Sequence, residues 1–135
     1  MKYAAPVLAM AVVGIVLFPV LAGNDFPSIS HEALTKAIKE KKVVLIDCNG
    51  SESYKNGHIP GALDMASAGK DLASKLPADK GALIVAYCGS EQCNAYQAGA
   101  KAAQKLGYTN VQHYAGGISG WKAKGETMEK AETAK

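Results

Sequence analysis

Two short runs of apolar residues constrain the fold of this 135-residue chain more than any other feature of its sequence. The runs are Val43–Ile46 and Ala82–Tyr87, and they are followed directly by Asp47 and Cys88. Neither run alternates between apolar and polar residues, so each predicts a strand that is buried on both faces. Such strands are typical of a parallel sheet covered by helices, and the chain is therefore predicted to be an α/β domain.

The segments between these runs have the spacing and the end signals of helices. Ser30 is a predicted N-cap, and Ala33, Leu34, Ala37 and Ile38 form one apolar stripe after it. Gly107 is a predicted C-terminal cap. The predicted helices are residues 31–42, 71–76 and 95–106, and the further predicted strands are residues 62–65 and 110–114. Residues 49–57 are predicted to be turns, and residues 116–121 a tight turn before a short terminal helix.

The first segment of the chain predicts export. Residues 3–22 carry no charge and follow Lys2, and Pro19 precedes a small-x-small pattern that favours signal cleavage after Ala22. A run of about 20 apolar residues is also long enough to be an uncleaved N-terminal anchor. We expect a periplasmic protein if the source is bacterial, or an anchored one facing the periplasm. Residues 23–29 are then a linker, 30–124 the domain and 125–135 a polar tail.

The composition excludes several classes of function. All fifteen basic residues are lysine, and the net charge is only +3. Arginine is the usual residue for bidentate recognition of phosphate, so a nucleic-acid partner is not expected. Three cysteines are too few for a disulfide scaffold and lack the spacing of a four-ligand zinc site. No metal site is predicted.

Two cysteines follow the buried strands at the edge where α/β sheets form their crevices. Cys48 comes directly after Asp47, and Cys88 opens the segment CGSEQCN, which leads into a helix. A thiol at Cys88 would face loop amides and the positive end of that helix, and both lower a thiol pKa. Cys88 is therefore the predicted nucleophile.

Several motifs surround these strands in a fixed order. They are Asp47, Tyr54, GHIPGAL at 57–63, ALIVAYC ending at Cys88, LGYTNV at 106–111 and GGISGW at 116–121. Together they resemble the rhodanese (sulfurtransferase) domain over residues 30–124. The resemblance implies a parallel five-stranded sheet flanked by helices on both faces. It also implies that Cys88 takes sulfane sulfur as a persulfide from thiosulfate, a persulfide or a polysulfide, and passes it to cyanide or a thiol without a cofactor.

The loop after Cys88 is the predicted anion-binding site. In such domains its backbone amides surround the cysteine sulfur, and a ring of N–H donors stabilises a persulfide anion without a metal. The loop residues are Gly89, Ser90, Glu91, Gln92 and Cys93. Related phosphatases have arginine where this chain has Asn94, so phosphatase activity is disfavoured. Asp47 and His58 are predicted supports, Asp47 for the neighbouring loop and His58 for the GHIPGA turn.

Two loop residues depart from the family pattern. A carboxylate at Glu91 would repel anionic donors such as thiosulfate, which favours persulfides or polysulfides. Cys93 has three interpretations: a bystander, a second sulfur carrier, or a resolving thiol that attacks the Cys88 persulfide and leaves a disulfide. Cys48 is interpreted as a small packing residue, with a Cys48–Cys88 bridge as the alternative.

Two other classes of function stay open. One is a dithiol redox protein in which Cys88 and Cys93 cycle between disulfide and dithiol. The other is a non-catalytic module that binds sulfur or a partner within an exported sulfur-oxidising or respiratory assembly. The expected partners are a small sulfur donor, a thiol or cyanide acceptor, and an exported redox or sulfur-carrier protein. A membrane is involved only if the N-terminal segment is uncleaved.

Overall fold

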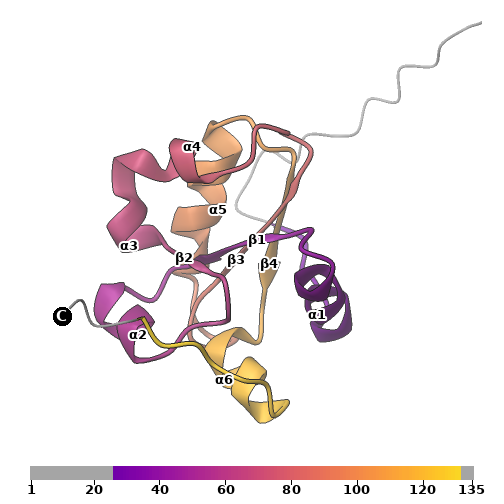
Figure 1. Ribbon diagram of the computed structural model, residues 1–135, viewed down its shortest axis with the longest axis vertical. Helices are drawn as coiled ribbons and strands as arrows, with labels where there is room; N and C mark the ends of the chain where they lie inside the picture. The colour runs from indigo at the N-terminus through magenta and orange to yellow at the C-terminus, as the bar shows by residue number, and fades with distance from the viewer. Residues whose placement is uncertain (1–25, 132–135) are drawn as a thin grey trace, which may run out of the picture.

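The computed structural model describes residues 26–131 and arranges them around one parallel sheet (Figure 1). The strands are β1 (Val44–Asp47), β2 (Leu63–Asp64), β3 (Leu83–Tyr87) and β4 (Asn110–Tyr114). Their order is β2-β1-β3-β4, and every neighbouring pair is parallel. The two apolar runs thus form the two central strands, which confirms the predicted α/β class.

The described residues form four strands, where the family resemblance implies five. Beside β4, the place of a further strand is taken by a single parallel bridge between Ser28 and His113. The Ile29 amide donates to the His113 carbonyl oxygen at 2.9 Å, and the His113 amide donates to Pro27 at 2.9 Å. Proline has no amide hydrogen, so Pro27 cannot donate a ladder bond of its own. The predicted linker is packed at this point, because Phe26 and Ile29 are buried.

The helices flank the sheet. They are α1 (His31–Lys39), α2 (Ser51–Asn56), α3 (Met65–Ala68), η1 (Gly69–Asp71), α4 (Leu72–Lys75), α5 (Tyr96–Lys105) and α6 (Gly117–Ala123). The predicted cap of α1 is confirmed, since the Ser30 side chain accepts a hydrogen bond from the Ala33 amide at 3.1 Å. The helix ends earlier than predicted, at Lys39, and Lys41 takes a positive φ of 55°.

Three predicted segments differ from the structure. Residues 51–56, predicted to be turns, form the helix α2. None of its residues is buried, and its sequence has no apolar stripe that would predict a helix. It is fastened instead by the Tyr54 hydroxyl, which donates to the Ala62 carbonyl oxygen at 2.6 Å. The predicted helix 71–76 is the end of a broken series, α3, η1 and α4. The GGISGW segment forms most of α6 rather than a turn before it.

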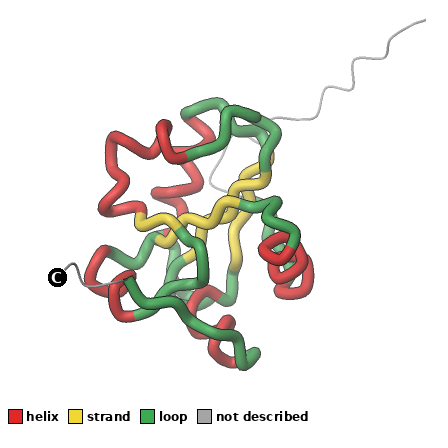
Figure 2. Tube along the Cα trace, in the orientation of Figure 1, coloured by secondary structure: helices red, strands yellow, loops and turns green. Residues whose placement is uncertain are grey.

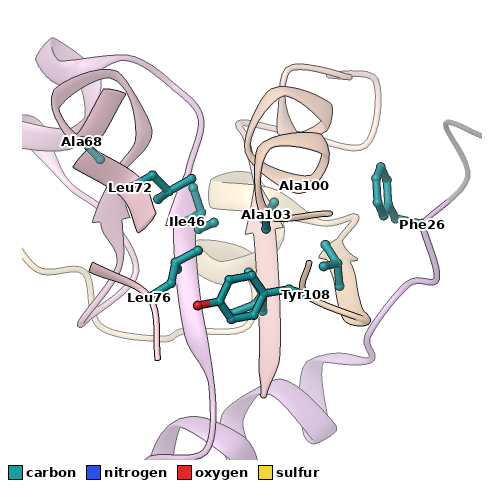
Figure 3. Packing of buried hydrophobic residues seen from close by; sticks show 11 residues of the cluster. Phe26, Ile46, Ala68, Leu72, Leu76, Ala100, Ala103 and Tyr108 are labelled. Carbon is teal, nitrogen blue, oxygen red and sulfur yellow. The ribbon is translucent and has the colours of Figure 1, made fainter. Parts of the chain in front are cut away.

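Side chains on the two faces of the sheet form two separate cores. On one face Ile46, Ile84 and Ala86 pack against α3, α4 and α5, as Figure 3 shows for Ile46 with Leu72 and Ala103. On the other face Leu45, Val85 and Tyr87 pack with Leu34 of α1 and Trp121 of α6. Figure 2 shows the strands between these two groups of helices. The predicted covering of both faces is confirmed.

The chain after α6 packs back onto the domain, which corrects the predicted polar tail over this stretch. The amides of His58 and Glu129 each donate to the other residue's carbonyl oxygen at 2.9 Å. The Glu129 carboxylate also accepts from the Gly61 amide, and the Trp121 ring nitrogen donates to Thr127, both at 2.9 Å. The predicted signal or anchor, 1–22, lies outside the described residues. Between residues 26 and 131, no helix combines the length and apolar character needed to cross a bilayer.

Candidate active site

Cys88 is the first residue after the central strand β3, and only 2% of its surface is exposed. Two hydrogen bonds from α6 fix its backbone: the Ile118 amide donates to the Cys88 carbonyl oxygen at 3.0 Å, and the Ser119 amide donates to Gly89 at 2.9 Å. The GGISGW segment therefore positions the start of the Cys88 loop. This contact requires a glycine at Gly117, where φ is +57°.

The loop that starts at Cys88 turns back, so that the thiols of Cys88 and Cys93 face the same cavity. The Cys93 amide donates to the Ser90 carbonyl oxygen at 3.1 Å, which closes a tight turn. The cavity beside it has a volume of about 170 Å³. Its lining residues are Cys88, Ser90, Glu91, Gln92, Cys93, Asn94, Tyr96, His113, Tyr114 and Ala115. The structure thus gathers four of the five predicted loop residues around Cys88, whereas Gly89 contributes its amide and not its surface.

Sequence reasoning missed one wall of the cavity. Tyr96 and His113 stack with their rings 4.3 Å apart and nearly parallel, at 11°. The His113 ring is held by a hydrogen bond of 2.9 Å to the Phe26 carbonyl oxygen. The sequence contained a signal for this wall of the cavity, because His113 and Tyr114 are the last residues of β4 and lie at the same sheet edge as Cys88.

The pKa of the Cys88 thiol is raised, which corrects the predicted lowering. Burial is the largest cause, and the hydrogen bond of the Cys88 thiol to Cys93 adds to it. The amides of Tyr96 and Gly89 hydrogen-bond to the sulfur and act in the opposite direction, but they do not outweigh burial. The predicted ring of amide donors is therefore incomplete around the Cys88 thiol when it carries no sulfur.

Cys93 is the more acidic thiol of the pair. Burial raises its pKa, but three hydrogen bonds to its sulfur outweigh that effect and the net pKa is lowered. The donors are the Cys88 thiol and the amides of Ala95 and Gly89. Of the two thiols, the partly buried Cys93 therefore loses its proton before the buried Cys88.

Cys48 lies apart from this pair, beneath α5. Its thiol points at the carbonyl oxygens of Ile46 and Tyr96, at 3.9 and 3.8 Å. Burial raises the pKa of Cys48 to about 12. All three cysteines are free, so the structure holds no Cys48–Cys88 bridge.

Asp47 is fully buried beside the loop and accepts three hydrogen bonds. The Asn49 amide and side chain donate to it at 2.8 and 3.0 Å, and the Tyr87 hydroxyl donates at 2.7 Å. The Tyr87 hydroxyl in turn accepts from the Ile59 amide at 3.0 Å, which ties β1, β3 and the GHIPGA turn together. Sequence reasoning anticipated the backbone donor but not Tyr87, although the two residues are register partners across β1 and β3.

His58 lies in the GHIPGA turn, away from the cavity lining. Its ring donates to the Tyr54 carbonyl oxygen at 2.7 Å and stacks on the Tyr54 ring at 3.7 Å. The His58 backbone also pairs with that of Glu129, and the residue is 2% exposed. His58 contacts the turn and the chain after α6, and it does not line the cavity.

Glu91 places a carboxylate at the cavity. Glu91 is exposed at the rim, and no lysine occurs among the described residues that line the cavity. Across residues 26–131, no three histidine, cysteine, aspartate or glutamate side chains are grouped to hold a metal ion.

Comparisons with known proteins agree with this geometry. The model of the rhodanese-like domain family matches residues 30–124. A thiosulfate sulfurtransferase, GlpE, from Coxiella burnetii is 27% identical over 105 residues, which cover 77% of this chain and 94% of that protein.

Two solved structures share the fold. A thiosulfate sulfurtransferase from Pseudomonas aeruginosa matches 80% of this chain with a TM-score of 0.66 and 22% identity, and this chain spans 21% of its length. The human single-domain sulfurtransferase TSTD1 matches 74% of this chain and 98% of its own, with a TM-score of 0.59 and 24% identity.

Proposed function

Because this chain belongs to the rhodanese-like domain family, we propose that it is a sulfurtransferase whose Cys88 carries sulfane sulfur as a persulfide. The observation that carries the proposal is the position of Cys88. It lies at the end of the central strand, with its sulfur facing a cavity and hydrogen-bonded by the amides of Gly89 and Tyr96. These donors are positioned to stabilise the larger charge of a persulfide anion.

Loading of Cys88 begins with loss of its proton. Cys93 lines the same cavity, and its thiolate is the base that takes this proton. The Cys88 thiolate then attacks the outer sulfur of a donor R–S–SH, forming the new S–S bond while the donor S–S bond breaks. The leaving thiolate takes the proton from Cys93, and the products are the Cys88 persulfide and R–SH.

The charge around the cavity favours an organic persulfide as donor. Thiosulfate is a dianion, and Glu91 is the only carboxylate at the rim, with no described lysine in the lining to offset it. The persulfide of a small neutral thiol carries at most one negative charge and is repelled less. The acceptor is a thiol or cyanide, which removes the outer sulfur from the cavity side.

The proposal is tested by single-turnover transfer. The reduced full-length chain is mixed with a small organic persulfide, quenched with acid at intervals, and weighed by intact mass spectrometry. At early times we expect a species with one added sulfur atom per chain, which cyanide removes as thiocyanate. Cys88→Ser should gain no sulfur, while Cys48→Ala, which removes a thiol outside the cavity, should behave as the parent. Equal uptake by Cys88→Ser and the parent would overturn the proposal.

A further inference from the structure

A second thiol, that of Cys93, shares the cavity with the Cys88 sulfur, and the proposed transfer does not use it as an acceptor of sulfur. Cys88 and Cys93 line the same cavity, and each thiol shifts the pKa of the other. We propose that Cys93 attacks the Cys88 persulfide, releases sulfide and closes a Cys88–Cys93 disulfide. This inference rests on the function proposed for Cys88. The protein is then a sulfide-releasing persulfide reductase as well as a sulfur carrier.

Backbone amides of the loop and of the residues after it hydrogen-bond to the two sulfur atoms. The Gly89 amide hydrogen-bonds to both sulfurs, the Tyr96 amide to Cys88 and the Ala95 amide to Cys93. The turn closed by the Cys93 amide and the Ser90 carbonyl oxygen returns the chain to Cys88. The approach of Cys93 to the Cys88 sulfur is therefore built into the loop before any sulfur is bound.

The geometry also selects which sulfur Cys93 attacks. Each thiol shifts the pKa of the other, so Cys93 lies near the Cys88 Sγ, which becomes the inner sulfur of the persulfide. The outer sulfur extends from it into the cavity, where an external acceptor reaches it. Attack on the inner sulfur expels the outer one as sulfide, whereas attack on the outer sulfur would only move the persulfide to Cys93.

Cys93 is also the cysteine of the pair that ionises more readily. Burial raises its pKa, but hydrogen bonds from the Cys88 thiol and from the Ala95 and Gly89 amides lower it overall, and the two amide bonds do not depend on the Cys88 proton. Cys93 is also the more exposed of the two. A thiolate is the attacking species in thiol–disulfide exchange. Cys48 cannot take this part, since its sulfur lies beneath α5 and burial raises its pKa to about 12.

The step balances without an added oxidant. The Cys93 thiolate forms an S–S bond to the inner sulfur of Cys88–S–SH, the original S–S bond breaks, and HS⁻ leaves with its electron pair. The sulfane sulfur is reduced to sulfide, and the two cysteines are oxidised to the disulfide. An external dithiol then supplies two electrons and two protons to restore the reduced pair. The inferred partner is therefore of the dithiol–disulfide exchange class.

One equivalent of a small organic persulfide, added anaerobically to the reduced full-length chain without other thiols, tests the inference. Sulfide, intact mass and a peptide map are followed with time. For the parent we expect one sulfide per chain, a final mass lower by two hydrogen atoms, and a disulfide between Cys88 and Cys93. Cys93→Ser lacks the thiolate that takes the Cys88 proton, so it is first loaded to completion; it should then keep the added sulfur, with sulfide release at least about tenfold slower. Cys48→Ala should match the parent.

The outcomes separate this inference from the function on which it rests. If the parent and Cys93→Ser both hold a persistent sulfur adduct, the inference is overturned and Cys88 transfer stands. Movement of the adduct to Cys93, seen in the peptide map, overturns it as well. If neither protein gains sulfur at Cys88, both fail together. Cys93→Ala repeats the comparison with a side chain that forms no hydrogen bond.

Discussion

Gly117 lies so close to Cys88 that a β-carbon on Gly117 would overlap the Cys88 carbonyl oxygen and lie 2.9 Å from its carbonyl carbon. The neighbouring Ile118 amide donates to that same carbonyl oxygen at 3.0 Å. The start of α6 and the start of the Cys88 loop are therefore in direct backbone contact. A change in one segment must displace the other.

Gly117→Ala should lower both stability and sulfur uptake. The residue has a positive φ as well as the close approach, so we expect a loss of roughly 2–4 kcal/mol in the free energy of unfolding. Urea denaturation and the single-turnover assay measure the two effects. Gly125→Ala is the matched control, because φ there is +75° but the β-carbon meets nothing within 4 Å. It should cost only about 1–2 kcal/mol and leave uptake unchanged. Equal losses in the two variants would contradict the close-approach argument.

Alkylation should distinguish the three thiols by pH. A lowered pKa means that Cys93 is ionised at a lower pH than an ordinary cysteine, so iodoacetamide should modify it first as the pH rises. Cys88, with a raised pKa, should follow at higher pH, and Cys48, whose pKa burial raises to about 12, should react last. Peptide mapping across a pH series provides the order. Modification of Cys88 ahead of Cys93 would contradict the assignment of the thiolate.

The same reagent should show that the two thiols are linked. The hydrogen bond and charge of Cys93 both raise the pKa of Cys88. Replacing Cys93 with serine removes the charge, so the Cys88 pKa should fall and its alkylation below the ordinary thiol pKa should become faster. Cys48→Ala leaves the pair intact and should not change the Cys88 profile. An identical Cys88 profile in Cys93→Ser and the parent would show that the thiols titrate independently.

Glu91→Gln should improve the use of thiosulfate. The side chain is exposed, so removing its charge should raise kcat/KM for this dianion by only about two- to fivefold at low salt. The gain should shrink as ionic strength rises, because screening weakens the repulsion. Glu52→Gln removes an exposed carboxylate from α2, outside the cavity lining, and serves as control. A gain that does not depend on salt would require a different explanation.

Asp47→Ala should destabilise the domain by about 3 kcal/mol, because it leaves the buried Tyr87 hydroxyl and the Asn49 donors without their acceptor. Tyr87→Phe should cost less, and the double variant should cost less than the sum by about 1–2 kcal/mol. Urea denaturation of the four proteins measures this coupling. Asp79→Ala, at an exposed turn, should cost less than about 1 kcal/mol. Additive losses would refute the Asp47–Tyr87 link.

The elements that sequence analysis predicted correctly are those whose signal is local. The two central strands follow from unbroken apolar runs, and the start of α1 follows from Ser30. The position of Cys88 at the end of β3 follows from the second run. Helix α2 was not predictable in this way, since its residues are polar and it is stabilised by contacts with Ala62 and Asp64 from elsewhere in the chain.

The electrostatics of the site depended on three-dimensional packing. Sequence reasoning located loop amides near Cys88 but had no measure of its burial, and burial decides the direction of its pKa. It left open whether Cys93 turns back towards Cys88, and it did not anticipate that His113 stacks on Tyr96. Each of these depends on contacts between segments that are separate in the sequence or on the path of the loop.

The position of Cys48 determines how the whole chain responds to oxidants. α5 passes directly over its sulfur, and a β-carbon on Gly99 would lie only 2.7 Å from it. Burial raises the pKa of Cys48 to about 12, so the folded molecule has two readily reactive thiols, both in one loop and able to pair with each other. Cys48 is only partly buried, so covalent dimers joined through it should form slowly from folded molecules and faster from molecules that have opened. Their yield under oxidising conditions therefore rises with the opening equilibrium.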